Sequence, residues 1–423
     1  MTSENKNSRE PKGYFHLVGL GEPFRLLFPL GAIIGILGVL MWPLFVWHIT
    51  KTYPGMAHPR VMIEGFATCF VIGFLGTALP RLLDVPRITL AETVSFAAAL
   101  IAIAACHCEG QMLWGDGLFF CTLAAFVLLL LRRASLRKDT PPPAFVLVGM
   151  GLLSGLAGSA IQALAQMAPL ALGDAMIHTG RLLLNQGYLL LPIMGIGAFL
   201  LPRFFGLPNR QSFPESHTLP PGWKGRALFA LACGVAVIAS FIIEAAGQTR
   251  WGCGLRAVAV IIYILREVPI HEAGFNGGTL AFGLRVALFA IPFGFTLMAI
   301  WPERIFSFFH VVFITGFSLL IFIVGTRVVL GHSGQSAKFR APPRPVLIMA
   351  LLLILAMLTR VTADWMPALC LKHYGYAASV WIAAVIIWAV SILPGVRRAD
   401  AGLDELAEPP AGEKIAKNQP DSP

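Results

Sequence analysis

The sequence predicts an all-α, polytopic membrane protein with about twelve transmembrane helices, arranged as three repeats of four helices. Long apolar blocks, the placement of basic residues and internal similarity predict this fold class. Of the 423 residues, 57% are hydrophobic and 13% are charged, whereas soluble domains average about 25% charged residues. A helix needs roughly 20 apolar residues to cross a bilayer, where it satisfies its own backbone hydrogen bonds. The composition therefore excludes a soluble enzyme.

Twelve apolar blocks define the predicted helices, and the eighth is the least certain because it is short. The N-terminal segment 1–23 and the charged tail 395–423, which we expect to be disordered, flank a membrane domain over 24–394. The blocks span residues 24–48, 60–82, 89–106, 113–131, 144–167, 178–202, 225–246, 252–268, 278–302, 305–331, 345–363 and 374–394.

Basic residues predict the orientation in the membrane. Of the 32 Lys and Arg residues, eight lie in the odd-numbered gaps between helices and twenty-three in the termini and even-numbered gaps. By the positive-inside bias, both termini are predicted to be cytoplasmic. The net charge of +10 thus reflects topology in a bilayer, and we expect no nucleic-acid partner.

Internal similarity predicts the repeats. Residues 65–86 and 187–208 share, without gaps, two glycines, a Leu-Pro-Arg triplet and a later proline. A fainter third copy contains Gly316-Phe317 and ends with Gly331-His332 in place of Pro-Arg. The predicted repeats are approximately 24–131, 144–268 and 278–394, in parallel orientation because four is an even number of spans.

Each repeat places a histidine at the outer end of its second helix. These are His58, His178 and His310, six to nine residues before a glycine-aromatic pair. Imidazole is a common ligand of haem iron and copper. The alternative is that each is an interfacial histidine that bonds a headgroup or a carbonyl.

Neighbouring residues offer further candidate ligands. Met62 follows His58 by one turn and either shares a soft metal with it or packs in the core. Glu64 is a costly intramembrane charge that can orient an imidazole, accept a proton or pair with a base. Cys106-His107-Cys108 offers three soft ligands in a row; its cysteines can instead form a disulfide with Cys253 or Cys370.

Three stretches resemble the NnrS family of bacterial inner-membrane proteins. They are residues 23–37, residues 57–82, and residues 310–334, which open with histidine and close with Arg327 and Gly-His332-Ser-Gly. The resemblance implies haem and copper as cofactors and a role in the nitric oxide response. Many members have His-x-His-Glu-Met at the second helix, where this chain has His58-Pro-Arg-Val-Met62, so Glu64 supplies a carboxylate one turn further on.

A looser architectural resemblance is to the catalytic subunit of haem-copper oxidases, which also has twelve helices in three arcs. It implies that His58 and His310 are axial haem ligands and that His178 binds copper or a second haem. His107 and His332 are further candidates, and His332 alternatively caps its helix end together with Arg327. The seventh predicted helix lacks the oxidases' paired histidines, so oxygen reduction is not expected.

The expected function is therefore binding, detoxification or shielding of nitric oxide by a haem- and copper-containing membrane protein. Whether it is an enzyme is left open, and turnover requires an electron donor that the sequence does not identify. The alternatives are a secondary transporter or permease, and a haem or copper sensor or assembly factor.

Overall fold

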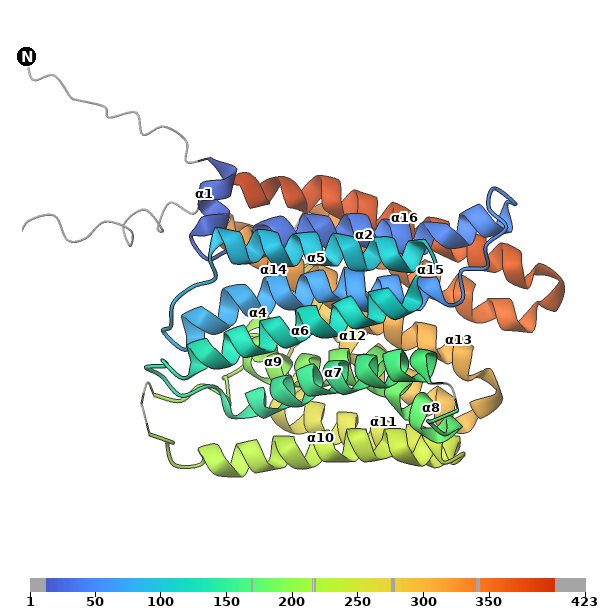
Figure 1. Ribbon diagram of the computed structural model, residues 1–423. Coiled ribbons are helices and arrows are strands. Elements are labelled where there is room, and N and C mark those ends of the chain that lie inside the picture. The colour runs from blue at the N-terminus through green and yellow to red at the C-terminus, as the bar shows by residue number, and fades with distance from the viewer. Residues whose placement is uncertain are drawn as a thin grey trace, which may run out of the picture.

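The computed structural model describes residues 13–168, 170–214, 216, 218–274, 278–339 and 343–399. Within these ranges the chain contains helices and no β-strand, which confirms the predicted all-α fold. The described segments join into twelve long helices. They lie side by side along one common direction, and the short helix α1 (Tyr14–Gly19) lies at one end of the bundle (Figure 1).

All twelve predicted blocks correspond to a helix, and the second helix of each predicted repeat is built from several segments. In chain order the helices are α2 (Phe24–Val46); α3 (Ala57–Arg60), η1 (Val61–Ala67) and α4 (Thr68–Leu82); α5 (Leu90–Cys108); α6 (Met112–Ala134); η2 (Pro143–Phe145) and α7 (Val146–Met167); α8 (Asp174–Leu182), η3 (Leu183–Gly187) and α9 (Tyr188–Phe204); α10 (Trp223–Ala245); α11 (Thr249–Glu267); α12 (Gly278–Ile300); η5 (Pro302–Arg304), α13 (Ile305–His310), η6 (Val311–Ser318) and α14 (Leu319–Gly331); α15 (Arg344–Thr362) and η8 (Ala363–Trp365); and η9 (Pro367–Leu369), α16 (Cys370–Ile392) and η10 (Leu393–Arg397).

Helix α11 explains why the eighth block is the least certain. Eleven helices of the described chain are long and apolar enough to cross a membrane, and α11 is not among them. It carries Arg250, Arg256, Arg266 and Glu267, which lower its apolar character. Arg256 and Glu267 are buried and paired with residues of α10, and the exposed Arg250 and Arg266 are each the second residue from an end of the helix. Paired charges inside the bundle do not face lipid, so α11 completes the set of twelve.

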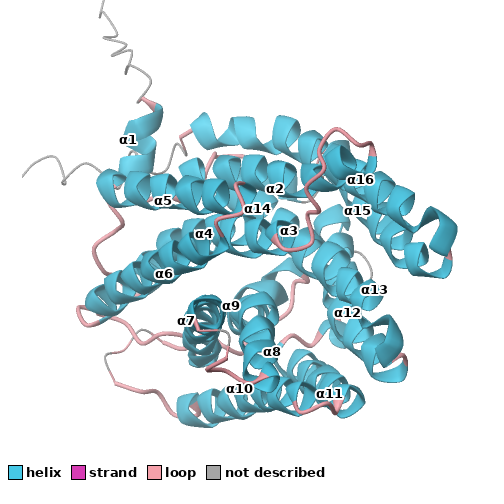
Figure 2. Cartoon of the chain, turned by 45° about the vertical axis from the view of Figure 1, so that its right-hand side comes forward, coloured by secondary structure: helices cyan, strands magenta, loops and turns pink. Residues whose placement is uncertain are grey.

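The second helix of each predicted repeat lies in the inner layer. In these three helices 78%, 78% and 67% of the apolar stretch is buried, against at most 61% in the other eight candidate spans. The remaining helices surround them, with α16 packed on α2, α5 on α6, α6 on α7, α10 on α11, and α11 on α12 (Figure 2).

Each inner helix is interrupted by a wider, π-helical segment at a corresponding place. The segments η1, η3 and η6 begin three, five and one residues after His58, His178 and His310. π-Helical turns are rare, occur mostly within α-helices, and are frequently found at functional sites. The division into three repeats remains a prediction, and this regular placement supports it.

The ends of the described chain meet at one face of the bundle, which we call the terminal face. The backbone carbonyls of Val396 and Arg398 accept hydrogen bonds from Arg25, at the start of α2, at 2.7 and 2.8 Å. Helices α3, α8 and α13 begin at the other end, which we call the opposite face. Residues 1–12 and 400–423, which hold much of the predicted N-terminal segment and tail, lie outside the described residues.

Close contact of α7 with the inner helix depends on Gly158. A Cβ atom there would lie 2.6 Å from the backbone nitrogen of Leu184 and 2.7 Å from the carbonyl oxygen of Gly180. We expect Gly158→Ala to destabilise the purified protein by about 1–3 kcal/mol, because two helix backbones must separate.

The matched control is Gly149→Ala in the same helix, where an added Cβ meets nothing within 4 Å. We expect it to leave stability unchanged or slightly raised, because Ala favours a helix over Gly. Unfolding in mixed micelles compares the two variants. Equal stability of both would show that the α7 contact does not constrain the bundle.

Candidate functional site

The structure distributes the predicted ligand residues over several places. His58, Met62 and His310 lie toward the opposite face, where His178 and His107 join two further clusters, and His332 lies at the terminal face. Of the three repeat histidines, His58 and His310 lie near enough for their charges to interact.

His58 and His310 share one hydrogen-bonding arrangement. The Nδ1 atom of His58 lies 3.0 Å from the carbonyl oxygen of Gly38, and that of His310 lies 2.7 Å from the carbonyl oxygen of Phe306. A carbonyl accepts only a protonated ring nitrogen, so each Nε2 carries the lone pair. Neither Nε2 has a hydrogen-bond partner within the described chain.

The surroundings of this pair are aromatic and basic. Trp42 meets the His58 ring edge-on at 6.0 Å between centroids. Arg360 interacts electrostatically with both histidines. Met62 packs against Gly38, because a Cβ at that glycine would lie 3.2 Å from its Sδ atom. Met62 therefore lies beside the residue whose carbonyl orients His58.

His178 belongs to a different cluster. Its Nε2 atom lies 3.6 Å from Glu244 Oε1, and the other oxygen of that buried carboxylate accepts a hydrogen bond from Arg256 at 2.5 Å. Arg256 also donates to Gln186 in η3 at 2.5 Å. The carboxylate thus joins α8, α10 and α11 and ties His178 into an ion pair.

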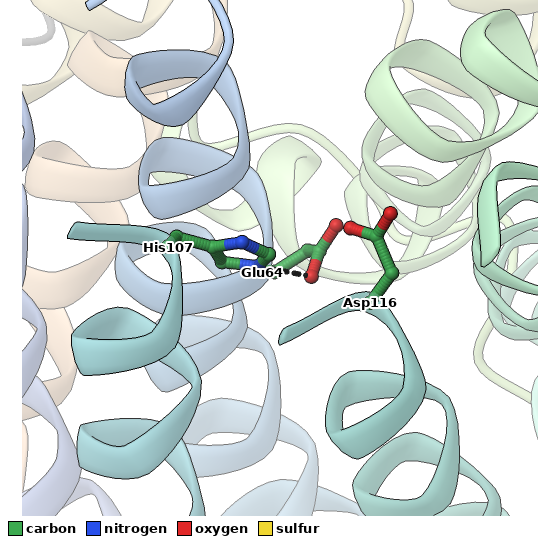
Figure 3. Close-up of side chains that lie close together, drawn as sticks. All are labelled: Glu64, His107 and Asp116. Carbon is green, nitrogen blue, oxygen red and sulfur yellow. Dashed lines mark hydrogen bonds and ion pairs between the residues drawn. The ribbon is translucent and has the colours of Figure 1, made fainter. Parts of the chain in front are cut away.

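A buried group of three metal-ligand types lies where α5, α6 and η1 meet. It consists of Glu64, His107 and Asp116, whose side chains are all fully buried, and one ligand atom of each lies within 4.8 Å of the others. His107 Nε2 lies 2.8 Å from Glu64 Oε2, and the two carboxylates face each other (Figure 3). Within the described chain, Glu64 Oε1 and His107 Nδ1 have no hydrogen-bond partner.

The sequence expectations for this region are only partly met. Glu64 orients an imidazole, but that imidazole is His107 and not the nearer His58 in sequence. Cys106 and Cys108 do not join the group, because neighbouring helix residues point about 100° apart. All seven cysteines are free, so the alternative of a disulfide with Cys253 or Cys370 is wrong.

Asp116 was not predicted as a site residue. It accepts hydrogen bonds from Arg60 at 2.7 and 3.1 Å and from Gln166 at 2.6 Å. The available signal was its charge, since Asp116 is the single acidic residue of α6 and an intramembrane acid is functional by default. Its position one turn from the helix start makes it resemble an interfacial residue.

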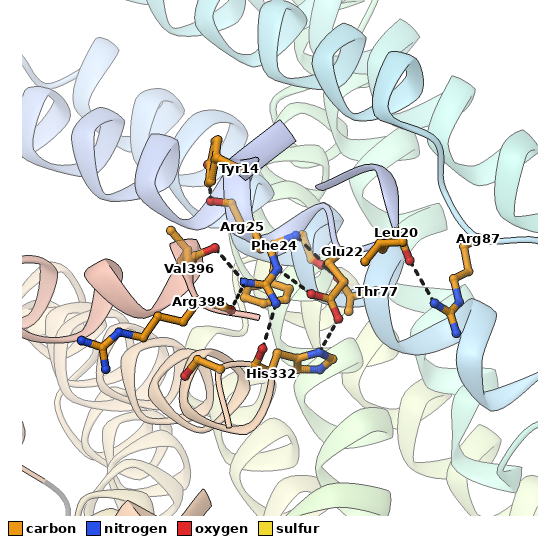
Figure 4. A network of polar contacts seen from close by, with 12 residues as sticks. Tyr14, Leu20, Glu22, Phe24, Arg25, Thr77, Arg87, His332, Val396 and Arg398 are labelled. Atoms are coloured by element: carbon orange, nitrogen blue, oxygen red, sulfur yellow. Dashed lines mark hydrogen bonds and ion pairs between the residues drawn. The ribbon is translucent and has the colours of Figure 1, made fainter. Parts of the chain in front are cut away.

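His332 joins a charged network at the terminal face. Its Nδ1 atom lies 2.7 Å from Glu22 Oε1 (Figure 4). Arg81 contacts both the imidazole and Glu22. Arg25 donates to Glu22 Oε2 at 2.5 Å and to the His332 carbonyl at 2.8 Å. Glu22 precedes the first apolar block, so hydropathy gave no reason to select it.

Arg327 does not share the His332 network. Its guanidinium stacks on the rings of Phe204 and Phe339, at 4.3 and 4.6 Å from their centroids. His332 ends its helix through its backbone, because its amide donates to the Val328 carbonyl at 3.0 Å. The two residues therefore lie at the same helix end with different partners.

The Glu22 carboxylate is held ionised by its partners. Burial raises its pKa, but the hydrogen bond and charge of His332, together with Arg25 and Arg81, outweigh burial and lower the pKa to about 2. The ionised form of Glu22 thus joins the start of α2 to the ends of α4 and α14.

These features define a polytopic membrane protein with imidazole and carboxylate clusters at both ends of its inner helices. The NnrS protein family profile matches residues 19–399, nearly the whole chain, and the chain belongs to this family. No curated protein shows significant similarity to it.

The lowered pKa of Glu22 predicts a pH-dependent contribution to stability. Its ordinary value is 4.5, so the contribution is complete above about pH 4.5 and is lost as the pH falls toward 2. We expect Glu22→Gln to lower the free energy of unfolding at pH 7 by about 3 kcal/mol. The difference from wild type should shrink between pH 5 and pH 3.

Glu92→Gln is the control, because Glu92 pairs with Arg133 in a partly exposed ion pair that contributes at most about 1 kcal/mol. Unfolding curves of the three proteins across this pH range give the comparison. A Glu22→Gln effect that is the same at every pH would contradict the ionised carboxylate.

Proposed function

We propose that this protein is a haem- and copper-carrying membrane protein of the nitric oxide response, which binds nitric oxide, removes it or protects cellular targets from it. Membership of the NnrS family supports the role. The observation that carries the proposal is the shared arrangement of His58 and His310, each with Nδ1 on a backbone carbonyl. That arrangement fixes the ring and leaves Nε2 as a metal ligand.

The haem is proposed to be held by His58 and His310. Both rings belong to inner helices and lie close enough to interact. A haem held there would supply a ferrous iron, which binds nitric oxide. Arg360, whose charge interacts with both histidines, supplies positive charge for the carboxylates that a haem carries.

The second metal is proposed to be held by His107 with Glu64 and Asp116. Two carboxylates and one imidazole suit a divalent ion, whereas copper(I) prefers sulfur ligands. Copper(II) therefore fits these donor atoms. Glu64 Oε1 and His107 Nδ1 are buried without a hydrogen-bond partner in the described chain, which supports a metal ion as their partner. Arg60 and Gln166 hold Asp116 in place.

His178 and His332 are weaker candidates for copper or a second haem. The Glu244–Arg256 ion pair engages His178, and Glu22 and Arg81 engage the ring of His332. A metal at either site must displace a charged partner. Met62, beside the residue that orients His58, and Arg327, at the helix end that carries His332, bind no metal in the proposal.

We place the protein in the bacterial inner membrane with both termini in the cytoplasm, so the opposite face with the histidine pair is periplasmic. The distribution of basic residues supports this orientation. Nitric oxide reaches the site through lipid, because it is small and apolar. Electrons for turnover come from an electron donor, either a quinol or a separate protein.

The haem ligands are tested by absorption spectra of protein expressed with added haem. We expect a Soret band in wild type and its loss or shift in His58→Ala and His310→Ala, because each removes an iron ligand. The control is His48→Asn, which changes an exposed histidine at the same face. Asparagine is chosen because His48 has φ +59°, which asparagine tolerates.

A nitric oxide electrode then separates the functions. Catalytic loss of nitric oxide with a reductant indicates turnover, and a stoichiometric response indicates a binding or sensing role. Absence of a Soret band in the wild type would overturn the haem proposal, and substrate uptake by proteoliposomes would favour the transporter alternative.

The second metal is tested by elemental analysis of purified protein. We expect His107→Ala to lose most of the bound copper. Gly115→Ala should act similarly without removing a donor, because its Cβ would lie 2.2 Å from the His107 ring. Gly117→Ala, whose Cβ meets nothing within 4 Å, should retain the metal.

Wild-type copper content in all three variants would place the copper elsewhere. The haem spectrum provides the independent readout, since we expect it to persist in His107→Ala. This separates loss of one metal from general misfolding.

A further inference from the structure

A cavity of about 440 Å³ opens at the terminal face between the ends of α4, α9 and α14. Its volume is in the range of small-molecule binding sites, about 300–1,000 Å³. Most of its wall is apolar, with Phe74, Leu200, Phe204, Val324, Val328 and Phe339 among the lining side chains. It lies at the other end of the bundle from the histidine pair, and none of its lining residues belongs to that pair or to the Glu64, His107 and Asp116 group.

The ionisable side chains that line the cavity are all basic. Arg81, Arg327 and His332 line it, and no acidic residue is among the lining side chains. Arg327 is packed between two lining rings, Phe204 and Phe339. Arg203, next to Phe204 in sequence, is close enough for its charge to repel Arg327.

Positive charge here exceeds the acid available to balance it. Glu22 is shared by Arg25, Arg81 and His332, and Arg81 Nε is buried without a hydrogen-bond partner in the described chain. Arg327 and Arg203 contact aromatic rings but no carboxylate among the described residues. Like charges held together at a cavity are stabilised by a bound anion.

We propose that this cavity binds an amphipathic anion, with a carboxylate or phosphate group at Arg327 and a hydrocarbon chain against the apolar wall. The guanidinium matches both acid groups through paired hydrogen bonds. Phe204 and Phe339 hold it in place by stacking. A free fatty acid and an anionic phospholipid share this chemistry, and both are available at a membrane surface.

Ligand retention by the full chain tests this site. Purified protein in neutral detergent is incubated with palmitate or phosphatidylglycerol, or with the uncharged or zwitterionic counterparts hexadecanol and phosphatidylcholine, and bound ligand is measured by native mass spectrometry. We expect wild-type protein to retain at least one of the two acidic ligands, palmitate or phosphatidylglycerol. We expect Arg327→Gln to weaken the binding of that ligand about tenfold or more, because a charge-assisted hydrogen bond is lost.

Arg266→Gln is the matched control. Arg266 also stacks on a phenylalanine, with its guanidinium carbon 4.0 Å from the Phe229 centroid, but it does not line the cavity. We expect unchanged binding. Ala78→Phe fills the cavity while every arginine is kept, and it should abolish binding. Size-exclusion chromatography identifies the variants that are folded. If only one of Arg327→Gln and Ala78→Phe is folded, that variant alone tests the proposal.

Retention of palmitate alone assigns the site to free fatty acids, and retention of phosphatidylglycerol alone assigns it to phospholipids. Equal retention of hexadecanol and palmitate would overturn the proposal, because the charge would play no role. Loss of the Soret band in Arg327→Gln would also overturn it, since the cavity would then belong to the haem. An unchanged Soret band with weakened acid binding supports a separate site.

Discussion

The structure depends on the need to neutralise carboxylates buried among apolar helices. An isolated charge in such a place costs several kcal/mol, so each acid needs a basic partner, which generally comes from another helix or loop. Four buried carboxylates of the described chain meet this need with arginine. The pairs are Glu22 with Arg25 and Arg81, Asp116 with Arg60, Glu244 with Arg256, and Glu267 with Arg226.

Glu64 is the exception among the buried carboxylates of the described chain. Its contact is with the imidazole of His107, and its second oxygen has no partner. The nearby Arg60 is turned to Asp116 instead. At the other end of the bundle the imbalance is reversed, because Arg327 and Arg203 contact aromatic rings and pair with no acid in the part of the chain that the structure describes. The incomplete charge balance at each face is the physical basis of the two proposals, a metal ion beside Glu64 and an anion beside Arg327.

Much of the fold was predictable because hydropathy and helix length are local properties. All twelve helices follow from apolar blocks, and the regular placement of His58 and His310 follows from comparing one inner helix with another. Asp116 and Glu22 were missed because their importance comes from partners distant in sequence, which pattern alone does not provide. His107 was predicted as a ligand together with Cys106 and Cys108, but its partners in the structure are Glu64 and Asp116. Adjacent residues of a helix point in different directions, so they do not share one site.

The π-helical segments link the local sequence of each inner helix to the directions in which its side chains point. An extra residue in a helical turn rotates everything beyond it by about 100°, and it does so at a cost in hydrogen-bond geometry. In each inner helix the histidine lies before this segment and the residues that reach the terminal face lie after it. The rotation therefore sets the direction of His58 and His310 separately from that of Arg81 and Arg327. One continuous helix can thus present a metal ligand at one face and a guanidinium at the other.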